Sequence, residues 1–109
     1  LILAAKSIRD KGISIIIITL GEKGLLAISS DKIFKQQAFP VRVVDTTGAG
    51  DAFIGNFATV YAQTQNIAQA IEYAAAAAAL NITKKGATSG NPTKKKVVQF
   101  LRNHHYNHS

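Results

Sequence analysis

The sequence predicts an α/β fold from two observations. Residues 14–20 read SIIIITL, a continuous β-branched run of strand length in which apolar and polar residues do not alternate. Such a run is typical of a strand that is covered on both faces, as in a parallel sheet. Three later segments, beginning near positions 51, 67 and 93, place apolar residues at helical spacing instead. We therefore expect a central, mostly parallel sheet flanked by helices, in one domain that spans residues 1–109.

The segment before this strand is interpreted as helical. Residues 1–12 read LILAAKSIRDKG, which is typical of the last turns of a helix that ends at Gly12. After the strand, glycines at positions 21 and 24 bracket a turn, and residues 25–29 are expected to return as a second strand. The helix and the strand after it together indicate an α/β unit.

The following stretch carries weaker signals. Weak alternation predicts a short strand around residues 32–34 and another near Ala38. Pro40 limits strand pairing and therefore marks an edge or a connection. Val43 and Val44 are expected to end a strand that leads directly into a turn of small residues.

That turn, within VVDTTGAGDAFIGN at residues 43–56, has the features of an anion site beside a base. Gly48 and Gly50 admit positive φ and carry no Cβ, so several backbone amides could point into one hollow. A helix N-terminus favours negative charge, which would suit a phosphate. Asp51 could then take a proton from a hydroxyl that attacks the phosphorus. The alternative is an ordinary strand-to-helix turn in which Asp51 is the N-cap.

The segment from Asp51 onward is predicted to be a helix with a core-facing stripe. Phe53, Phe57, Val60 and Tyr61 fall on or near one face at spacings of three and four residues. We interpret these aromatic residues as core rather than as a platform for a base.

Two further helices are expected. Asn66 can cap a helix from Ile67 to about Thr83, and its run of alanines at 74–79 would allow close approach between backbones. Thr93 can cap the last helix, with an expected core stripe of Val97, Val98 and Leu101 and a water-facing side formed by Lys94, Lys95, Lys96 and Arg102. The histidines that follow are expected in a frayed polar tail rather than in a metal site, namely His104, His105 and His108.

Three motifs together resemble one enzyme family. DTTGAGDAF at residues 45–53 resembles the C-terminal signature of the ribokinase-like (PfkB) carbohydrate kinases. TLGEKG at 19–24 is similar to the nucleotide-binding turn of that family, and KKGATSGNP at 84–92 is similar to its potassium and adenine loop. The motifs occur in family order, and the resemblance covers nearly the whole chain. It implies the C-terminal third of a three-layer α/β/α kinase domain, without the N-terminal sugar-binding part and the lid.

The resemblance implies ATP-dependent phosphorylation of a sugar hydroxyl. Asp51 would be the catalytic base, and the amides of Gly48, Ala49, Gly50 and Asp51 would form the anion hole. Gly50 and Asp51 would also contact the nucleotide, together with Ala75 in the adenine wall and the turn residues Thr19, Leu20, Gly21, Glu22, Lys23 and Gly24. Taken alone, the GEKG segment fits a plain hairpin turn better than a nucleotide-binding turn.

The resemblance also implies a potassium site and a requirement for Mg²⁺. The potassium ligands would be the carboxylate of Asp45, main-chain carbonyls and a group near Gly90, with the carbonyls supplied by Thr47, Asn81, Lys84 and Gly86. Asn81 replaces a usual small residue, although only its carbonyl would be needed. Gly90 lacks the hydroxyl that some relatives offer, so Ser89 is an alternative. The residues associated with magnesium lie in the part of the family fold that precedes this chain.

Ribose, converted to ribose 5-phosphate, is the leading substrate because the KKGA loop resembles that of ribokinase, while adenosine, fructose and deoxyribose stay open. The resemblance further implies a parent enzyme that dimerises through the missing lid, and an isolated chain without activity.

Composition limits which other classes of function are compatible with the sequence. The chain has no cysteine, and no apolar run or leader that would indicate a membrane span or export, so a cytoplasmic enzyme without a membrane partner is expected. The net charge of +7 raises the possibility of nucleic acid, but no aromatic residues alternate with the lysine clusters, which favours a solvated face. A non-catalytic nucleotide-binding module, or pseudo-kinase, and a basic nucleic-acid binder are the alternative readings.

Overall fold

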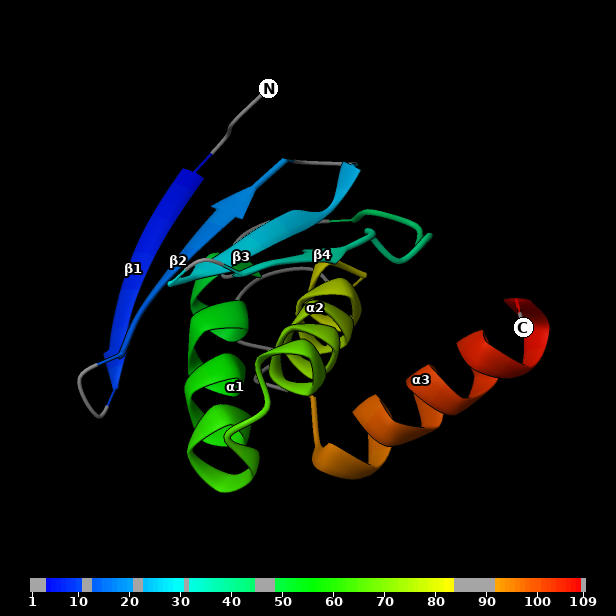
Figure 1. The fold of residues 1–109 in the computed structure, drawn as a ribbon. Coiled ribbons are helices and arrows are strands. Elements are labelled where there is room, and N and C mark those ends of the chain that lie inside the picture. The colour runs from blue at the N-terminus through cyan, green and yellow to red at the C-terminus, as the bar shows by residue number, and fades with distance from the viewer. Residues whose placement is uncertain are drawn as a thin grey trace. The chain divides into compact units, whose positions relative to one another are not determined.

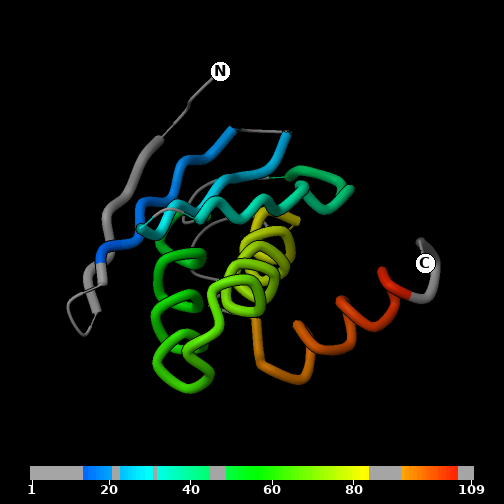
Figure 2. Tube along the Cα trace, viewed as in Figure 1, coloured from blue at the N-terminus to red at the C-terminus, as the bar shows by residue number. Residues whose placement is uncertain are grey.

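A computed structural model of the chain describes residues 4–10, 13–20, 23–30, 32–44, 49–83 and 92–108 (Figures 1 and 2). The chain divides into two compact units, Leu1–Ala38 and Phe39–Ser109, and each is described by itself. The first unit contains the strands and the second contains the helices.

The first unit is an antiparallel sheet of four strands. β1 spans Ala4–Asp10, β2 spans Ile13–Thr19, β3 spans Leu25–Ser29 and β4 spans Lys32–Gln36. The strands are ordered β1-β2-β3-β4, so each one pairs with its neighbour in the sequence. The predicted strands at residues 25–29 and near 32–34 are therefore confirmed.

The helix predicted within residues 1–12 is wrong. Residues 4–10 form β1, whose seven residues pair in register with β2, from Ala4 opposite Thr19 to Asp10 opposite Ile13. The partner strand supplies the hydrogen bonds that a helix would have made internally, and such tertiary pairing overrides local preference. Gly12, the expected helix stop, lies outside the described residues.

The parallel pairing expected for residues 14–20 is also wrong for the strands that the structure describes. β2 runs antiparallel to both of its neighbours. Only residues 11–12 separate β1 from β2, and only residues 20–24 separate β2 from β3, whereas a parallel pair needs a crossover of about a dozen residues or more. Nor is β2 covered on both faces, because Ile15 and Ile17 are buried while Ile16 is 42% exposed.

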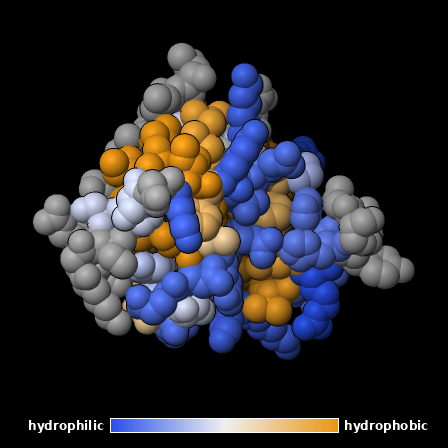
Figure 3. Space-filling model, viewed as in Figure 1, coloured by the Kyte–Doolittle hydropathy of each residue, from blue (hydrophilic) through white to orange (hydrophobic). Residues whose placement is uncertain are grey.

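The chain leaves the sheet without forming a further strand. Residues 37–44 are irregular, so the strand expected near Ala38 and the strand end expected at Val43 and Val44 are wrong. Both valines are more than half exposed. Hydrophobic surface is also visible on the face drawn in Figure 3. Single exposed apolar side chains are ordinary in folded proteins, so we assign these no role.

The second unit begins with a helical hairpin. α1 spans Ala49–Thr64 and α2 spans Ile67–Ile82, and the two helices pack against each other (Figure 1). The predicted core stripe of α1 is confirmed, since all four of its residues are buried, and the rings of Phe53, Phe57 and Tyr61 stack in sequence. The predicted cap of α2 is confirmed as well: Asn66 Oδ1 accepts a hydrogen bond from the Gln69 amide at 3.0 Å.

The alanine run of α2 is mostly core. Ala74, Ala76 and Ala77 are completely buried, and the side chains are small enough for neighbouring elements to approach closely. One hydrophobic cluster joins α2 to the irregular segment and to the last helix through the buried residues Phe39, Ala76, Ala77, Ala79 and Val97.

α3 spans Lys94–His108 and begins at the predicted cap, because Thr93 Oγ1 accepts a hydrogen bond from the Lys96 amide at 3.2 Å. Its core stripe differs from the prediction: Val97 is buried and Leu101 packs on the cluster, but Val98 is 37% exposed and Phe100 packs there instead.

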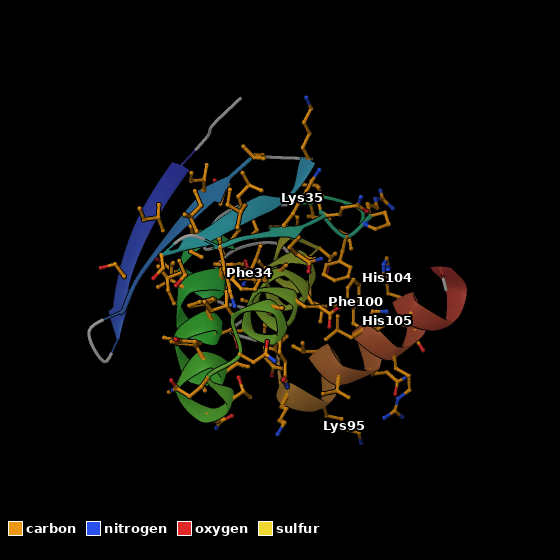
Figure 4. All side chains as sticks on the ribbon, in the orientation of Figure 1. Phe34, Lys35, Lys95, Phe100, His104 and His105 are labelled. Atoms are coloured by element: carbon orange, nitrogen blue, oxygen red, sulfur yellow. The ribbon has the colours of Figure 1, made fainter. Side chains whose placement is uncertain are left out.

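The frayed tail predicted after α3 is wrong, since His104 and His105 are helical. The His104 ring lies edge-on to Phe39, with centroids 4.8 Å apart, and His105 Nε2 lies 3.3 Å from Glu72 Oε2 of α2 (Figure 4). These contacts extend the helix beyond the point that its local sequence suggests.

Candidate functional site

The first turn of α1 holds three of the predicted site residues. The helix begins at Ala49, so Asp51 lies inside its first turn rather than before it. The interpretation of Asp51 as an ordinary N-cap is therefore wrong, because an N-cap residue precedes the first helical residue. Gly48, which precedes the helix, lies outside the described residues.

This helix start is open and chemically suited to an anion. Gly50 and Asp51 are exposed, Ala49 is half-buried, and a Cβ built on Gly50 would meet no atom within 4 Å. The first N–H groups of a helix have no acceptor within the helix, and the helix dipole places positive charge there. Among the described residues, the backbone at Gly50 and Asp51 is therefore accessible to solvent.

A backbone hydrogen bond joins the start of the small-residue turn to the end of α2. The Val44 amide donates to the Ile82 carbonyl oxygen at 2.7 Å. Apart from Asn81, the predicted cation ligands come from the two segments that leave this point, one after Val44 and one after Ile82. The bond therefore holds the beginnings of both segments together, although most of the predicted ligands lie outside the described residues, namely Asp45, Thr47, Lys84, Gly86 and Gly90.

Of the predicted cation ligands, Asn81 is the one that the structure describes. It lies in the last turn of α2 and is 7% exposed, and its buried Oδ1 atom has no hydrogen-bond partner among the described residues. The sequence interpretation considered only its main-chain carbonyl. Asn81 follows Ala77 by four positions and Ala74 by seven, so the three residues share one face of the helix. Both alanines are fully buried, and this spacing is the sequence signal that the Asn81 side chain is buried too.

The predicted nucleotide turn belongs to the first unit. The Leu20 amide donates to the Gly24 carbonyl at 2.7 Å and the Lys23 amide donates to the Leu20 carbonyl at 3.2 Å, so the turn is closed by its own backbone. Thr19 and Leu20 are half-buried and Lys23 is exposed, whereas Gly21 and Glu22 lie outside the described residues.

Gly24 has a structural reason to be glycine. Its φ is +99°, and an added Cβ would lie 2.0 Å from the Gln36 carbonyl oxygen. A side chain here would clash with the backbone at the end of β4. The geometry therefore explains this glycine without a ligand.

Ala75 is half-buried in α2 and packs against the hydrophobic cluster of Phe39 and Val97.

The described residues contain no group of three or more His, Cys, Asp or Glu side chains that could hold a metal ion. Within the same residues, no helix has the length and apolar character needed to span a bilayer.

The chain is similar to curated sugar kinases. It is 44% identical over 98 residues to the deoxyribokinase of Salmonella typhi and 42% identical over 98 residues to the ribokinase of Haemophilus influenzae. Each alignment covers 90% of this chain and 32% of the relative. The chain thus spans about a third of the length of these proteins.

Solved structures agree in fold. The ribokinase of Arabidopsis thaliana, complexed with ribose and ATP, matches with a TM-score of 0.73 at 37% identity, over 78% of this chain and 28% of that one. The Escherichia coli protein proposed to be ribokinase II, in complex with ATP and Mg²⁺, matches with a TM-score of 0.75 at 30% identity, over 80% and 28%. A double mutant of Vibrio cholerae fructokinase, bound to fructose, ADP and potassium, matches with a TM-score of 0.73 at 31% identity, over 80% and 30%.

These matches confirm the predicted fold class, a part of the ribokinase-like α/β fold. The model of the family described as pfkB family carbohydrate kinase matches residues 1–94, which is most of the chain. This chain therefore belongs to the pfkB family of carbohydrate kinases.

Proposed function

We propose that this chain is the part of an ATP-dependent sugar kinase that holds the triphosphate and the catalytic base. The observation that carries the proposal is the start of α1, where the exposed carboxylate of Asp51 stands beside backbone N–H groups that lack helical acceptors. Family membership supports a phosphoryl transfer to a sugar hydroxyl, because the similar proteins are deoxyribokinase and ribokinase.

In the proposed reaction, Asp51 removes the proton of the sugar hydroxyl as its oxygen attacks the γ-phosphorus of ATP, and ADP leaves with the bridging oxygen. The amides of Gly48, Ala49, Gly50 and Asp51 donate to the phosphoryl oxygens as negative charge develops there. Such donors need close approach but no side chain, and the open space around Gly50 meets that requirement.

The turn at residues 19–24 would lie along the nucleotide, with Lys23 near its phosphates and Ala75 in the wall of the adenine pocket. The exposed position of Lys23 is compatible with a phosphate contact. The carbonyls and hydrogen-bonded backbone of this turn would then position the nucleotide, while Gly24 keeps the turn compact.

A potassium ion would be bound by Asp45, Thr47, Asn81, Lys84, Gly86 and a group at Gly90 or Ser89. Two observations fit such a site: Asn81 Oδ1 is buried without a partner among the described residues, and the Val44 amide donates to the Ile82 carbonyl. When bound, the ion would add positive potential beside the anion hole. Mg²⁺ would accompany ATP and neutralise its phosphate charge, and the described residues of this chain offer it no cluster of acidic ligands.

Ribose is the proposed substrate, with deoxyribose, fructose and adenosine as competitors, since the similar proteins include a ribokinase and a deoxyribokinase. The proposed parent enzyme is a homodimer. It is located in the cytoplasm and has no nucleic-acid or membrane partner.

The test is Asp51→Asn in a full-length kinase that contains this chain, assayed by ADP release with each candidate sugar. Removing a general base should lower turnover by about 10² to 10⁴. Glu72→Gln is the matched control, because it makes the same carboxylate-to-amide change at a surface position of α2 that pairs with His105. Turnover of the Asp51 variant near that of the control would contradict the proposal. ATP binding without transfer by the unmodified kinase would favour the pseudo-kinase alternative.

A further inference from the structure

The segment that leads toward the start of α1 is held at both of its ends. Residues 39–44 have no regular secondary structure, so their position depends on contacts with other elements. At one end, Phe39 is 8% exposed and belongs to the hydrophobic cluster of α2 and α3. At the other end, the Val44 amide donates to the Ile82 carbonyl at 2.7 Å. Val41, between them, packs on the same cluster.

Two rings of α3 contact Phe39. Phe100 and His104 are four residues apart and therefore lie on one face of the helix (Figure 4). Their ring centroids lie 5.4 Å and 4.8 Å from the centroid of Phe39, with interplanar angles of 77° and 85°. Edge-to-face pairs of this kind are stabilised beyond the burial of their surface. The next residue, His105, places Nε2 3.3 Å from Glu72 Oε2 and so joins this part of α3 to α2.

These contacts connect α3 to the proposed site. Residues 45–48 join Val44 to Ala49, the first residue of α1, so the position of Val44 sets one end of a short connection. Asp51 lies in the first turn of α1. α3 lies almost entirely beyond residues 1–94, the part of the chain that the family model matches. The contacts of α3 can therefore influence the site without belonging to the matched sequence.

We propose that Phe100 and His104 are positioning residues that act through Phe39 on the segment leading to α1. The inference rests on the proposed function and goes beyond it, because it adds residues of α3 that the proposed reaction does not use. Phosphoryl transfer depends on the alignment of the base and the amide donors with the substrate, and a displacement of about 1 Å can lower the rate about 10²-fold. The two rings hold Phe39, and the bond of the Val44 amide holds the other end of the segment.

The first measurement is amide hydrogen exchange in the full chain, followed at single residues by nuclear magnetic resonance. In Phe100→Ala and in His104→Ala, the Val44 amide exchanges at least about tenfold faster, because the segment opens locally when a ring contact is lost. The Gln65 and Ala70 amides, which are bonded within the hairpin of α1 and α2, keep their rates. Phe100→Leu, which keeps apolar volume but has no ring, is measured beside them to separate local opening from general unfolding.

The second measurement is the steady-state kinetics of the same variants in a full-length kinase that contains this chain. The variants lower kcat by at least about tenfold and change KM for the sugar by less than about twofold, since alignment is lost rather than binding. Phe100→Tyr keeps the ring and restores kcat. Val98→Ala is the matched control, because it truncates an apolar side chain of α3 that is 37% exposed. It leaves both kcat and the exchange of the Val44 amide unchanged.

Unchanged exchange of the Val44 amide in the Phe100 and His104 variants would overturn the restraint by α3. Equal acceleration of the Val44, Gln65 and Ala70 amides in all of these variants would overturn it as well, because the rings would then support the whole unit. Faster local exchange with an unchanged kcat would overturn the positioning role. Absence of sugar phosphorylation by the unmodified kinase would overturn the proposed function and the positioning role with it, whereas the exchange measurement reports the restraint without any activity.

Discussion

Gly24 and Gly55 are both glycines, but the space around them differs. A Cβ on Gly24 would lie 2.0 Å from the Gln36 carbonyl oxygen and 2.9 Å from the Ala38 nitrogen, whereas a Cβ on Gly55 would meet nothing within 4 Å. Gly24 also has a positive φ, and Gly55 lies in the interior of α1. The sequence alone does not show which of the two glycines tolerates a side chain. The surrounding backbone does.

We therefore expect opposite effects from the same substitution. Gly24→Ala should destabilise the fold by at least about 2 kcal/mol, through backbone strain and the clash with the end of β4. Gly55→Ala should stabilise it by about 0.5–1 kcal/mol, because alanine loses less entropy in a helix. Urea denaturation of the two variants measures both values. Equal effects of the two substitutions would show that the turn relaxes around a side chain.

Tyr73 makes the stability of the second unit depend on pH in the alkaline range. Burial raises the pKa of the Tyr73 phenol, because the phenolate is poorly solvated beside the hydrophobic cluster. The folded state therefore holds this proton more tightly than the unfolded state. The resulting stabilisation is complete below the unfolded-state pKa of about 10 and is lost as the pH rises through the higher folded-state pKa.

Tyr73→Phe should remove this component. The variant and the unmodified chain should have similar stability near neutral pH, and the variant should lose less stability between about pH 9 and about pH 11. Denaturant midpoints measured across that range test the expectation. Parallel pH profiles of the two proteins would contradict it.

At the scale of elements, the helices of the second unit were the best predicted part of the fold. Their apolar spacing and caps are local properties, and Asn66 and Thr93 act as the caps that the sequence indicates. The strands were predicted less well, because a strand forms its backbone hydrogen bonds with another strand rather than within itself. Residues 4–10 form a strand only because β2 lies beside them.

The connection between α1 and α2 contains a residue in an unusual conformation. Gln65 has a φ of +54°, the left-handed region in which helices commonly end with glycine. Its amide donates to the Tyr61 carbonyl at 2.8 Å, which closes the helix end. The side chain also donates to that carbonyl, from Nε2 at 3.1 Å.

Gln65→Gly should be more stable than Gln65→Ala by about 1 kcal/mol, because only glycine adopts this conformation without strain from a Cβ. Both variants lose the same side-chain hydrogen bond, so the difference between them isolates the backbone term. Denaturant unfolding of the pair is the measurement, and equal stability would show that the chain adopts another turn here.

At the scale of the whole molecule, the chain spans about a third of the length of its relatives and carries a net charge of +7.

The 109-residue chain alone should bind ATP weakly, with a Kd above about 1 mM, and should phosphorylate no sugar. Calorimetric titration and an ADP-release assay with ribose test this expectation. Inorganic triphosphate is the control ligand, because equal affinity for it would show attraction to charge without recognition of the adenine. Turnover by the isolated chain would contradict the assignment of sugar binding to a missing part.

Local sequence determined the three helices of the second unit, the caps of α2 and α3 and the kinase family, because each of these depends on neighbouring residues or on short motifs. Tertiary structure alone decided that residues 4–10 pair as a strand, that the described sheet is antiparallel, and that Gly24 admits no side chain. It also decided that Asn81 is buried, with an Oδ1 atom that has no hydrogen-bond partner among the described residues. These features depend on contacts between different elements, and pairing and burial between elements cannot be read from local propensity.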